Sequence, residues 1–167
     1  MTEPRLEDLA LVFPEARAVL EKAGRSPART LATAESCTGG LLAAALTAVP
    51  GSSTAFLGGV VAYANALKLG ELGVPRELLE AHGAVSLEVA KSMALGVRER
   101  FQSSFGISTT GIAGPDAAES KPAGLIFVAV AGIDGTTVRQ LGRDQGRHQN
   151  RVNAVSAALE LMLAVLN

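Results

Sequence analysis

The sequence contains a single cysteine, Cys37, and its only histidines, His82 and His148, lie far apart along the chain. One cysteine cannot close a disulfide within the chain, and it cannot supply a metal site built from cysteine clusters. Neither histidine belongs to the HExxH spacing with which many enzymes hold zinc. The sequence therefore predicts no disulfide, no metal site and no bound cofactor.

An excess of charge of one sign and a long apolar run are also missing. The formal net charge is -1 at pH 7, which does not favour binding to nucleic acid or to a membrane surface. Glycine or a charged residue interrupts every apolar run before it reaches the length that spans a membrane. The N-terminal segment MTEPRLEDLA is acidic and lacks the apolar centre of a secretory signal. We therefore expect a cytoplasmic protein with no nucleic-acid or membrane partner.

The composition that remains suits one compact domain over residues 1–167, since 48% of the residues are hydrophobic and 18 are glycine. Strand patterns cover residues 30–34, 55–63, 105–110, 125–133 and 136–141, with a hairpin turn at Asp134-Gly135. Helical patterns cover residues 5–23 (interrupted at Pro14), 39–49, 65–72, 76–81, 87–101 (capped by Ser86) and 147–166.

Segment 55–63 is apolar throughout and is predicted to be a strand buried on both faces. Strands and helices alternate along the chain, and a hairpin follows them. This order predicts an α/β fold, a three-layer α/β/α sandwich around a mixed, mainly parallel sheet of about five or six strands. In such sheets ligands bind at the carboxyl ends of the strands, so the segments that follow the strands are the candidate sites.

The segment LATAESCTGGLL, residues 31–42, reads as a strand, a tight turn and the start of a helix. Such a turn can hold the Ser36 hydroxyl above the sheet edge and direct free backbone N–H groups beside it, as a nucleophile with an anion hole requires. Cys37 competes for this role because a thiol is intrinsically the better nucleophile, but we predict Ser36. The alternative is an ordinary helix cap made by Ser36 or Thr38.

The second segment holds Tyr63, the only tyrosine, and Lys68 five positions later. A neutral lysine can act as the base for a serine if its pKa falls from about 10.4 to near 7. Burial beside the sheet edge would lower the pKa in this way, and Tyr63 could relay a proton or orient the amine. The alternative is that Tyr63 packs at the strand end and Lys68 is solvated.

The third segment, TTGIAGP at residues 109–115, is a glycine-rich loop that follows a strand. Its backbone N–H groups could bind a phosphate or an oxyanion, although a simple turn cluster has the same composition. Lys121, Arg147 and Arg151 are candidate partners for an anion. The two arginines are four residues apart and share one face of the last helix, which could equally be a solvated face.

Several motifs occur in a fixed order: AESCTGG at 34–40, GSS at 51–53, YANALK at 63–68, HGAVS at 82–86, TGIAGP at 110–115, KPAG at 121–124, and the pair Arg147 and Arg151. This set, over roughly residues 6–166, resembles the C-terminal domain of the competence-damage-inducible CinA family, which also occurs alone as nicotinamide-nucleotide amidohydrolase. Two positions depart from the family pattern: Ala64 replaces a frequent serine, and Gly146 replaces a frequent acidic residue. Longer members carry a further N-terminal domain, whose activity we do not expect here.

The resemblance implies that nicotinamide mononucleotide (NMN) is hydrolysed to nicotinate mononucleotide and ammonia, in pyridine nucleotide recycling. It implies Ser36 as the nucleophile, with Tyr63 and Lys68 as its partners, and no metal. The residues expected to bind the substrate are Glu35, Thr38, Gly39, Gly40, Thr110, Gly111, Ala113, Gly114, Lys121, Arg147 and Arg151. A non-catalytic nucleotide-binding module and a purely structural domain are the competing hypotheses. We also expect a homo-oligomer and favour a dimer.

Overall fold

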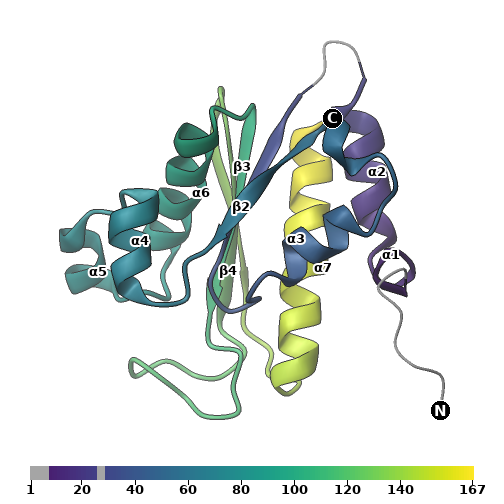
Figure 1. Ribbon diagram of the computed structural model, residues 1–167. Coiled ribbons are helices and arrows are strands. Elements are labelled where there is room, and N and C mark those ends of the chain that lie inside the picture. The colour runs from purple at the N-terminus through teal and green to yellow at the C-terminus, as the bar shows by residue number, and fades with distance from the viewer. Residues whose placement is uncertain (1–7, 26–28) are drawn as a thin grey trace.

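The computed structural model describes residues 8–25 and 29–167, and its central sheet is covered by helices on both faces (Figure 1). Helices α4, α5 and α6 lie on one side, and α1, α2, α3 and α7 lie on the other (Figure 1). The helices are α1 (Asp8–Val12), α2 (Pro14–Ala23), α3 (Leu41–Thr47), α4 (Asn65–Leu72), α5 (Arg76–His82), α6 (Leu87–Phe101) and α7 (Arg147–Val165), and Ser52–Thr54 forms a 3-10 turn. The strands are β1 (Leu31–Glu35), β2 (Phe56–Val61), β3 (Phe105–Gly111), β4 (Ile126–Gly132) and β5 (Gly135–Leu141). The predicted α/β/α sandwich is confirmed.

The sheet has five strands in the order β2-β1-β3-β4-β5. Strand β1 is parallel to both β2 and β3, whereas the β3–β4 and β4–β5 pairs are antiparallel. The sheet is therefore mixed, as predicted, with its parallel pairs at one side and its antiparallel pairs at the other. In the register, Glu35 lies beside Val61 of β2 and Thr109 of β3. The carboxyl ends of the three parallel strands thus meet at one edge.

Local sequence signals explain where several helices begin. Pro14 opens α2 as a separate helix, so the interruption predicted there is confirmed, while residues 5–7 of that expected helix lie outside the described residues. Ser86 caps α6, since its Oγ accepts a hydrogen bond from the Val89 N–H at 3.2 Å. Helix α3 starts two residues later than predicted because Gly39 and Gly40 have φ angles of 60° and 95°, in the left-handed region.

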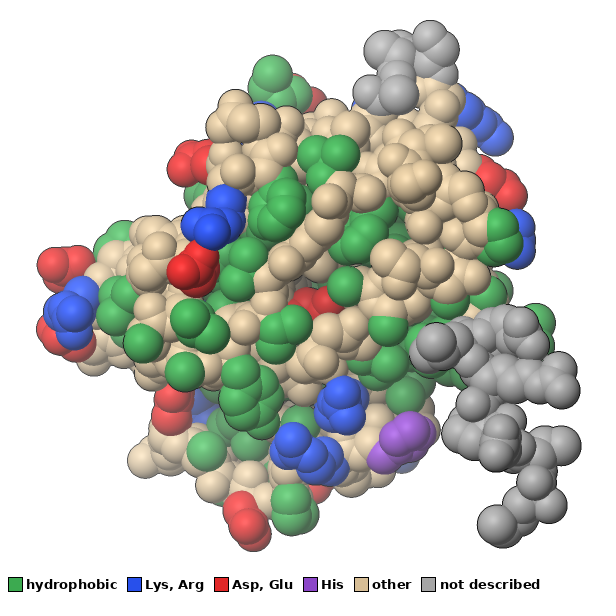
Figure 2. Space-filling view, in the orientation of Figure 1, with side chains coloured by type: hydrophobic (Ala, Val, Ile, Leu, Met, Phe, Trp, Pro, Cys, Tyr) green, Lys and Arg blue, Asp and Glu red, His purple; other side chains and the backbone are tan. Residues whose placement is uncertain are grey.

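Strand β2 corrects the prediction of a strand buried on both faces. It lies at the edge of the sheet, and its exposure alternates, so that Leu57 and Val61 are each 46% exposed. Figure 2 shows hydrophobic side chains at the surface over this strand. The glycines there serve close packing, because a Cβ on Gly59 would lie 2.1 Å from the Thr33 Oγ1. An uninterrupted apolar run therefore marked an edge strand here, and not a central one.

The predicted hairpin turn lies one residue earlier than expected. Gly132 pairs with Gly135, so that Ile133 and Asp134 form the turn.

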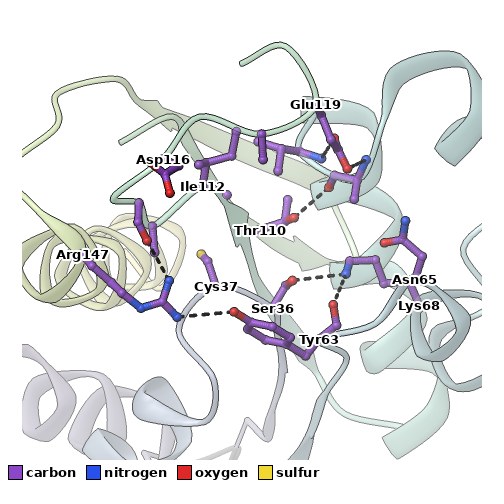
Figure 3. Close-up of a pocket in the computed structure, with 16 residues that line it drawn as sticks. Ser36, Cys37, Tyr63, Asn65, Lys68, Thr110, Ile112, Asp116, Glu119 and Arg147 are labelled. Carbon is purple, nitrogen blue, oxygen red and sulfur yellow. Dashed lines mark hydrogen bonds between the residues drawn. The ribbon is translucent and has the colours of Figure 1, made fainter. Parts of the chain in front are cut away.

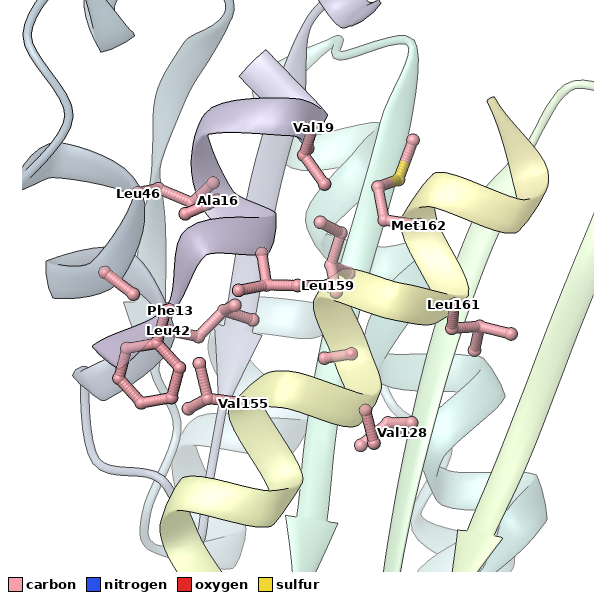
Figure 4. Close-up of a cluster of buried hydrophobic side chains, with 14 of the residues drawn as sticks. Phe13, Ala16, Val19, Leu42, Leu46, Val128, Val155, Leu159, Leu161 and Met162 are labelled. Atoms are coloured by element: carbon pink, nitrogen blue, oxygen red, sulfur yellow. The ribbon is translucent and has the colours of Figure 1, made fainter. Parts of the chain in front are cut away.

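Helix α7 packs on the sheet beside α2 and α3 (Figure 4). The core that these elements share contains Phe13, Val19, Leu42, Val155, Leu159 and Met162. On the opposite face α6 contributes Val89, Met93 and Val97. Within the described residues no helix is long and apolar enough to cross a membrane.

Helix α6 approaches its neighbours closely where it carries glycine. A Cβ added to Gly96 would lie 1.8 Å from the carbonyl oxygen of Leu72, at the end of α4. Gly70, within α4 itself, has nothing within 4 Å of the corresponding position. The two glycines therefore offer a matched pair of substitutions, one blocked by backbone and one open to solvent.

We predict that Gly96→Ala lowers the free energy of unfolding by about 1–3 kcal/mol, because the added methyl group must displace the end of α4. Gly70→Ala should raise it by about 0.5–1 kcal/mol, since alanine is the better helix former. Urea unfolding followed by circular dichroism measures both changes. Equal stabilisation by the two substitutions would contradict the close approach of α6 to α4.

Candidate active site

Ser36 and Lys68 lie together at the edge where the parallel strands end. Ser36 follows β1, and its N–H donates to the Thr109 carbonyl of β3 at 2.9 Å, which fixes the turn against the sheet. Lys68 comes from α4, and its Nζ lies 3.2 Å from the Ser36 Oγ (Figure 3). The lysine is only 1% exposed, so it is not the solvated side chain of the alternative interpretation.

The amine of Lys68 has a complete set of partners. Its Nζ lies 2.9 Å from the Ala62 carbonyl oxygen and 3.2 Å from that of Tyr63, in addition to the Ser36 hydroxyl. A neutral amine has two N–H groups and one lone pair. The two N–H groups can donate to the two carbonyls, which leaves the lone pair facing the Ser36 hydroxyl. The arrangement therefore suits a lysine that accepts the serine proton.

Burial favours this neutral form. Within the described part of the chain, no carboxylate forms a salt bridge with Lys68. Desolvation by burial lowers the pKa of the Lys68 amine below its ordinary value, and the charge of Glu119 opposes this shift more weakly. The direction of the shift is the one that a lysine base requires.

Cys37 lies next to Ser36 but has a different environment. It is 6% exposed, and burial raises the pKa of its thiol to about 12. The thiolate is the reactive form of cysteine, so this thiol is almost entirely unreactive at neutral pH. The geometry thus favours Ser36 over Cys37 as the nucleophile.

Glu35 does not face the pocket, although we expected it to bind substrate. Its Oε2 accepts hydrogen bonds from the N–H groups of Gly40 and Leu42, both at 3.0 Å, and its Oε1 accepts from Ala43 at 2.8 Å. The carboxylate is 1% exposed, and these hydrogen bonds place it at the positive N-terminus of α3. The anion hole expected at this helix start is filled by the protein itself. Among the described residues, only the Cys37 and Thr38 N–H groups of this turn have no acceptor.

Thr38 and Arg151 also serve the turn. The Thr38 Oγ1 lies 2.6 Å from Glu35 Oε2 and 2.7 Å from Thr109 Oγ1, in a fully buried position. Arg151 donates to the Thr38 carbonyl at 2.8 Å. These contacts hold the segment that carries Ser36, and they use the groups that we expected to contact substrate.

The pocket above Ser36 has a volume of about 300 Å³, at the small end of the range for small-molecule sites. All three segments that follow the parallel strands contribute to it, together with the start of α7 (Figure 3). Its lining consists of Ser36, Cys37, Tyr63, Asn65, Lys68, Ala84, Val85, Thr110, Gly111, Ile112, Ala113, Gly114, Asp116, Ala118, Glu119 and Arg147. The predicted convergence of the three loops on one edge is therefore observed.

The expected substrate-binding residues separate into two groups. Thr110, Gly111, Ala113, Gly114 and Arg147 line the pocket, whereas Glu35, Thr38, Gly39, Gly40, Lys121 and Arg151 do not. Sequence reasoning missed Asn65, Ala84, Val85, Ile112, Asp116, Ala118 and Glu119 as lining residues. Asn65 lies within the YANALK motif and could have been found there, and extending TGIAGP by one residue would have found Asp116.

The third loop is held from behind by Asn150, which sequence reasoning also missed. Asn150 is 1% exposed, and its Nδ2 donates to the Ala113 carbonyl at 2.9 Å. Arg147 donates to the next carbonyl, that of Gly114, at 2.8 Å. Both loop carbonyls thus point toward α7. The N–H groups of Ala113 and Gly114 have no acceptor in the part of the chain that the structure describes.

Of the three cations expected to bind an anion, only Arg147 borders the pocket. Its guanidinium also lies 3.4 Å from the Tyr63 hydroxyl (Figure 3). Among the described residues, this is the only hydrogen bond of the Tyr63 side chain. Tyr63 is 60% exposed and meets Lys68 through its backbone carbonyl, with its phenol directed to Arg147 instead. A proton relay through the Tyr63 hydroxyl stays a prediction. No group of three histidine, cysteine or acidic side chains in residues 8–25 and 29–167 could hold a metal ion.

A serine and a buried lysine at the carboxyl edge of a mixed sheet define an α/β protein with a serine-type candidate active site. The chain belongs to the CinA C-terminal domain family, whose model matches residues 15–166. The resemblance seen in the sequence motifs is thereby confirmed.

Relatives and solved structures agree with this membership. A CinA-like protein of Frankia casuarinae is 50% identical over 137 residues, which are 82% of this chain and 32% of that protein. The chain spans about a third of the length of the curated relatives it matches. The competence/damage inducible protein CihA of Agrobacterium tumefaciens superposes with a TM-score of 0.83 at 36% identity, covering 100% of this chain and 99% of that one. A CinA superfamily protein of Escherichia coli gives 0.83 at 30% identity, with 96% and 90% covered.

We predict that Glu35→Ala lowers the free energy of unfolding by about 3–5 kcal/mol, because buried N–H groups of α3 lose a charged acceptor. Glu35→Gln should lower it by less than Glu35→Ala does, because the amide keeps one acceptor oxygen. It should still lower it, because the NH2 group of the amide then faces N–H donors. Glu21→Ala, on the exposed side of α2, is the control and should change stability by less than about 0.5 kcal/mol. Urea unfolding measures the three variants, and a Glu35→Ala value near that of the control would refute the capping role.

Proposed function

We propose that this chain is a serine amidohydrolase that converts NMN and water to nicotinate mononucleotide and ammonia. The observation that carries the proposal is the buried Lys68 amine 3.2 Å from the Ser36 hydroxyl, with its remaining contacts made by carbonyls. Membership of the CinA C-terminal domain family supports the choice of substrate, because the motif resemblance extends to single-domain nicotinamide-nucleotide amidohydrolases.

The first half of the reaction breaks the amide. Ser36 Oγ attacks the carboxamide carbon while its proton moves to the Lys68 amine. The negative oxygen that forms is stabilised by unpaired backbone N–H groups, for which Cys37 and Ala113 are the candidates in the pocket lining. Lys68 then gives its proton to the departing nitrogen, so that ammonia leaves and an ester of Ser36 remains.

The second half consumes water. With Lys68 neutral again, it takes a proton from a water molecule that attacks the ester carbon. Collapse of this intermediate returns the proton to Ser36 Oγ and releases the carboxylic acid. The balance is one amide and one water in, one acid and one ammonia out, and it needs neither a metal nor a redox cofactor.

Arg147 is the group best placed to bind the substrate phosphate. It lines the pocket, and its side chain is exposed, unlike the buried pair at Ser36. Lys121 and Arg151 do not line the pocket and bind backbone carbonyls instead, so they no longer support phosphate binding. The anion is therefore bound at the α7 side of the pocket, away from the reacting carbon.

A non-catalytic nucleotide-binding module is the alternative that the same pocket allows. Measurement of ammonia release from NMN by the purified chain separates the two functions. Binding in a thermal-shift experiment without ammonia release would favour the alternative.

We predict that Ser36→Ala lowers kcat for NMN by about 10³-fold or more, because the attacking oxygen is lost. Cys37→Ser is the matched control and should keep most of the activity, since the buried thiol is protonated and takes no part. Ammonia release under saturating substrate measures both. If the Cys37 variant is the inactive one, the nucleophile has been assigned to the wrong neighbour.

We predict that Lys68→Arg is as inactive as Lys68→Met, because a guanidinium stays protonated at all working pH values. In the unchanged chain the neutral amine is the active form, so kcat/KM should rise with pH through the lowered pKa of Lys68. The midpoint of this rise should therefore lie below the ordinary lysine value of about 10.4. Near-normal activity of Lys68→Arg would show that the residue supplies charge only.

We predict the order NMN, nicotinamide riboside and free nicotinamide for falling kcat/KM, because remote binding positions the amide. Arg147→Met should reduce kcat/KM for NMN by about 10–100-fold more than that for the riboside, because only NMN loses a charged phosphate contact, whereas both substrates lose the support of the Gly114 carbonyl. Arg139→Met is the control, since Arg139 lies on β5 and pairs with Glu160. Equal effects on NMN and on the riboside would show that Arg147 does not bind the phosphate.

A further inference from the structure

Ala84 and Val85 form part of the pocket wall, in segment 82–85, which runs from the last residue of α5 toward α6. This segment has no regular partner strand. The Thr110 hydroxyl donates to its Ala84 carbonyl at 2.7 Å, and two side chains of a distant loop bind more of its backbone. These two are Glu119 (Figure 3) and Lys121, which we call the clasp.

The clasp supplies both acceptors and donors to this backbone. The Glu119 carboxylate accepts from the N–H groups of Ala84 and Val85, each at 3.3 Å. The Lys121 Nζ donates to the carbonyls of His82 at 2.6 Å and Val85 at 2.7 Å. These lengths make the lysine contacts the tighter half of the clasp.

The fit between the clasp and the segment leaves no spare room. Gly83 has a φ of 75°, and a Cβ there would lie 2.5 Å from Glu119 Oε2 and 3.0 Å from Lys121 Nζ. The two clasp side chains also lie 3.8 Å from each other as an ion pair. A glycine at this point thus lets the loop dock directly on the backbone of the wall.

The loop that carries the clasp is itself held in an uncommon conformation. Ala118 and Lys121 exchange backbone hydrogen bonds of 3.1 and 2.8 Å, and between them Glu119 and Ser120 have φ angles of 51° and 58°. Residues other than glycine rarely adopt such angles unless surrounding contacts hold them. The contacts of the clasp with segment 82–85 supply that hold.

We propose, on the basis of the function proposed above, that Glu119 and Lys121 are positioning residues of this site. They fasten the Ala84–Val85 part of the wall of the pocket that Ser36, Lys68 and Glu119 also line. Lys121 thereby acts on the protein's own backbone, where the sequence had suggested a substrate phosphate.

The electrostatic part follows from the groups around Lys68. Burial lowers the pKa of its amine, the charge of Glu119 raises it, and Cys37 contributes a smaller effect in the same direction. Tyr63, Asp116 and Arg147 are the other ionisable groups of the pocket lining. Removing the Glu119 charge should therefore move the titration of Lys68 to lower pH.

The first experiment measures that titration directly and does not require turnover. The lysines of the chain are Lys22, Lys68, Lys91 and Lys121. With carbon-13 in the lysine side chains, NMR follows each amine against pH, and the signal missing from Lys68→Met identifies Lys68. Glu119→Gln, which keeps the shape of the side chain, should shift Lys68 to lower pH, whereas the control Glu160→Gln on α7 should not. An unchanged Lys68 titration in Glu119→Gln would overturn the electrostatic role.

The second experiment tests the clasp with a double-mutant cycle of Glu119→Gln and Lys121→Met. We expect each to lower kcat for NMN and for nicotinamide riboside by similar factors, and the double variant to lose less than the product of the single losses. A rise in KM confined to NMN in Lys121→Met, with independent effects in the cycle, would show that Lys121 binds phosphate and would overturn the positioning role. Absence of turnover in the unchanged chain would count against the proposed function alone, because the NMR titration still decides this inference.

Discussion

The burial of the Lys68 amine is the constraint on which the site depends. An amine without solvent must satisfy its hydrogen bonds within the protein, and the carbonyls of Ala62 and Tyr63 do so where the chain leaves β2. The same carbonyls leave the remaining direction of the amine for Ser36. Because α4 begins only three residues after Ala62, the helix carries the lysine back over the strand end from which its partners come. The short connection between β2 and α4 therefore places both Lys68 and the carbonyls that it binds.

Glu35 solves the complementary problem on the β1 side. A sharp turn into α3 leaves several N–H groups without partners, and one buried carboxylate binds them. The turn can then hold Ser36 at the pocket without losing its shape, and the protein's own carboxylate neutralises the positive helix end. The carboxylate that stabilises the helix therefore binds N–H groups of this turn other than those of Cys37 and Thr38.

The sequence predicted most of the elements because each carries its own local signal, such as Pro14 before α2 or Ser86 before α6. Ser36 and Lys68 could also be predicted, since each follows a strand that reaches the same edge. The roles of Glu35 and Lys121 could not be predicted, because the sequence of a motif does not distinguish a charged side chain that binds substrate from one that binds the protein backbone. Asn150 was invisible for a related reason: its partners, Ala113 and Asp144, are set by how α7 docks on the sheet. Edge placement of β2 likewise depends on strand order, which composition does not encode.

The pairing of β1 with β2 fixes the distance between Ser36 and Lys68. Ser36 belongs to the end of one strand and the Lys68 partners to the end of the other, and the two strands are locked with Glu35 beside Val61. A slip of one residue would displace β2 by about 3.3 Å and turn its side chains to the opposite face. That distance is as long as the hydrogen bond between the serine and the lysine. The register of the β1–β2 hydrogen bonds therefore sets the alignment of the Ser36 hydroxyl with the Lys68 amine.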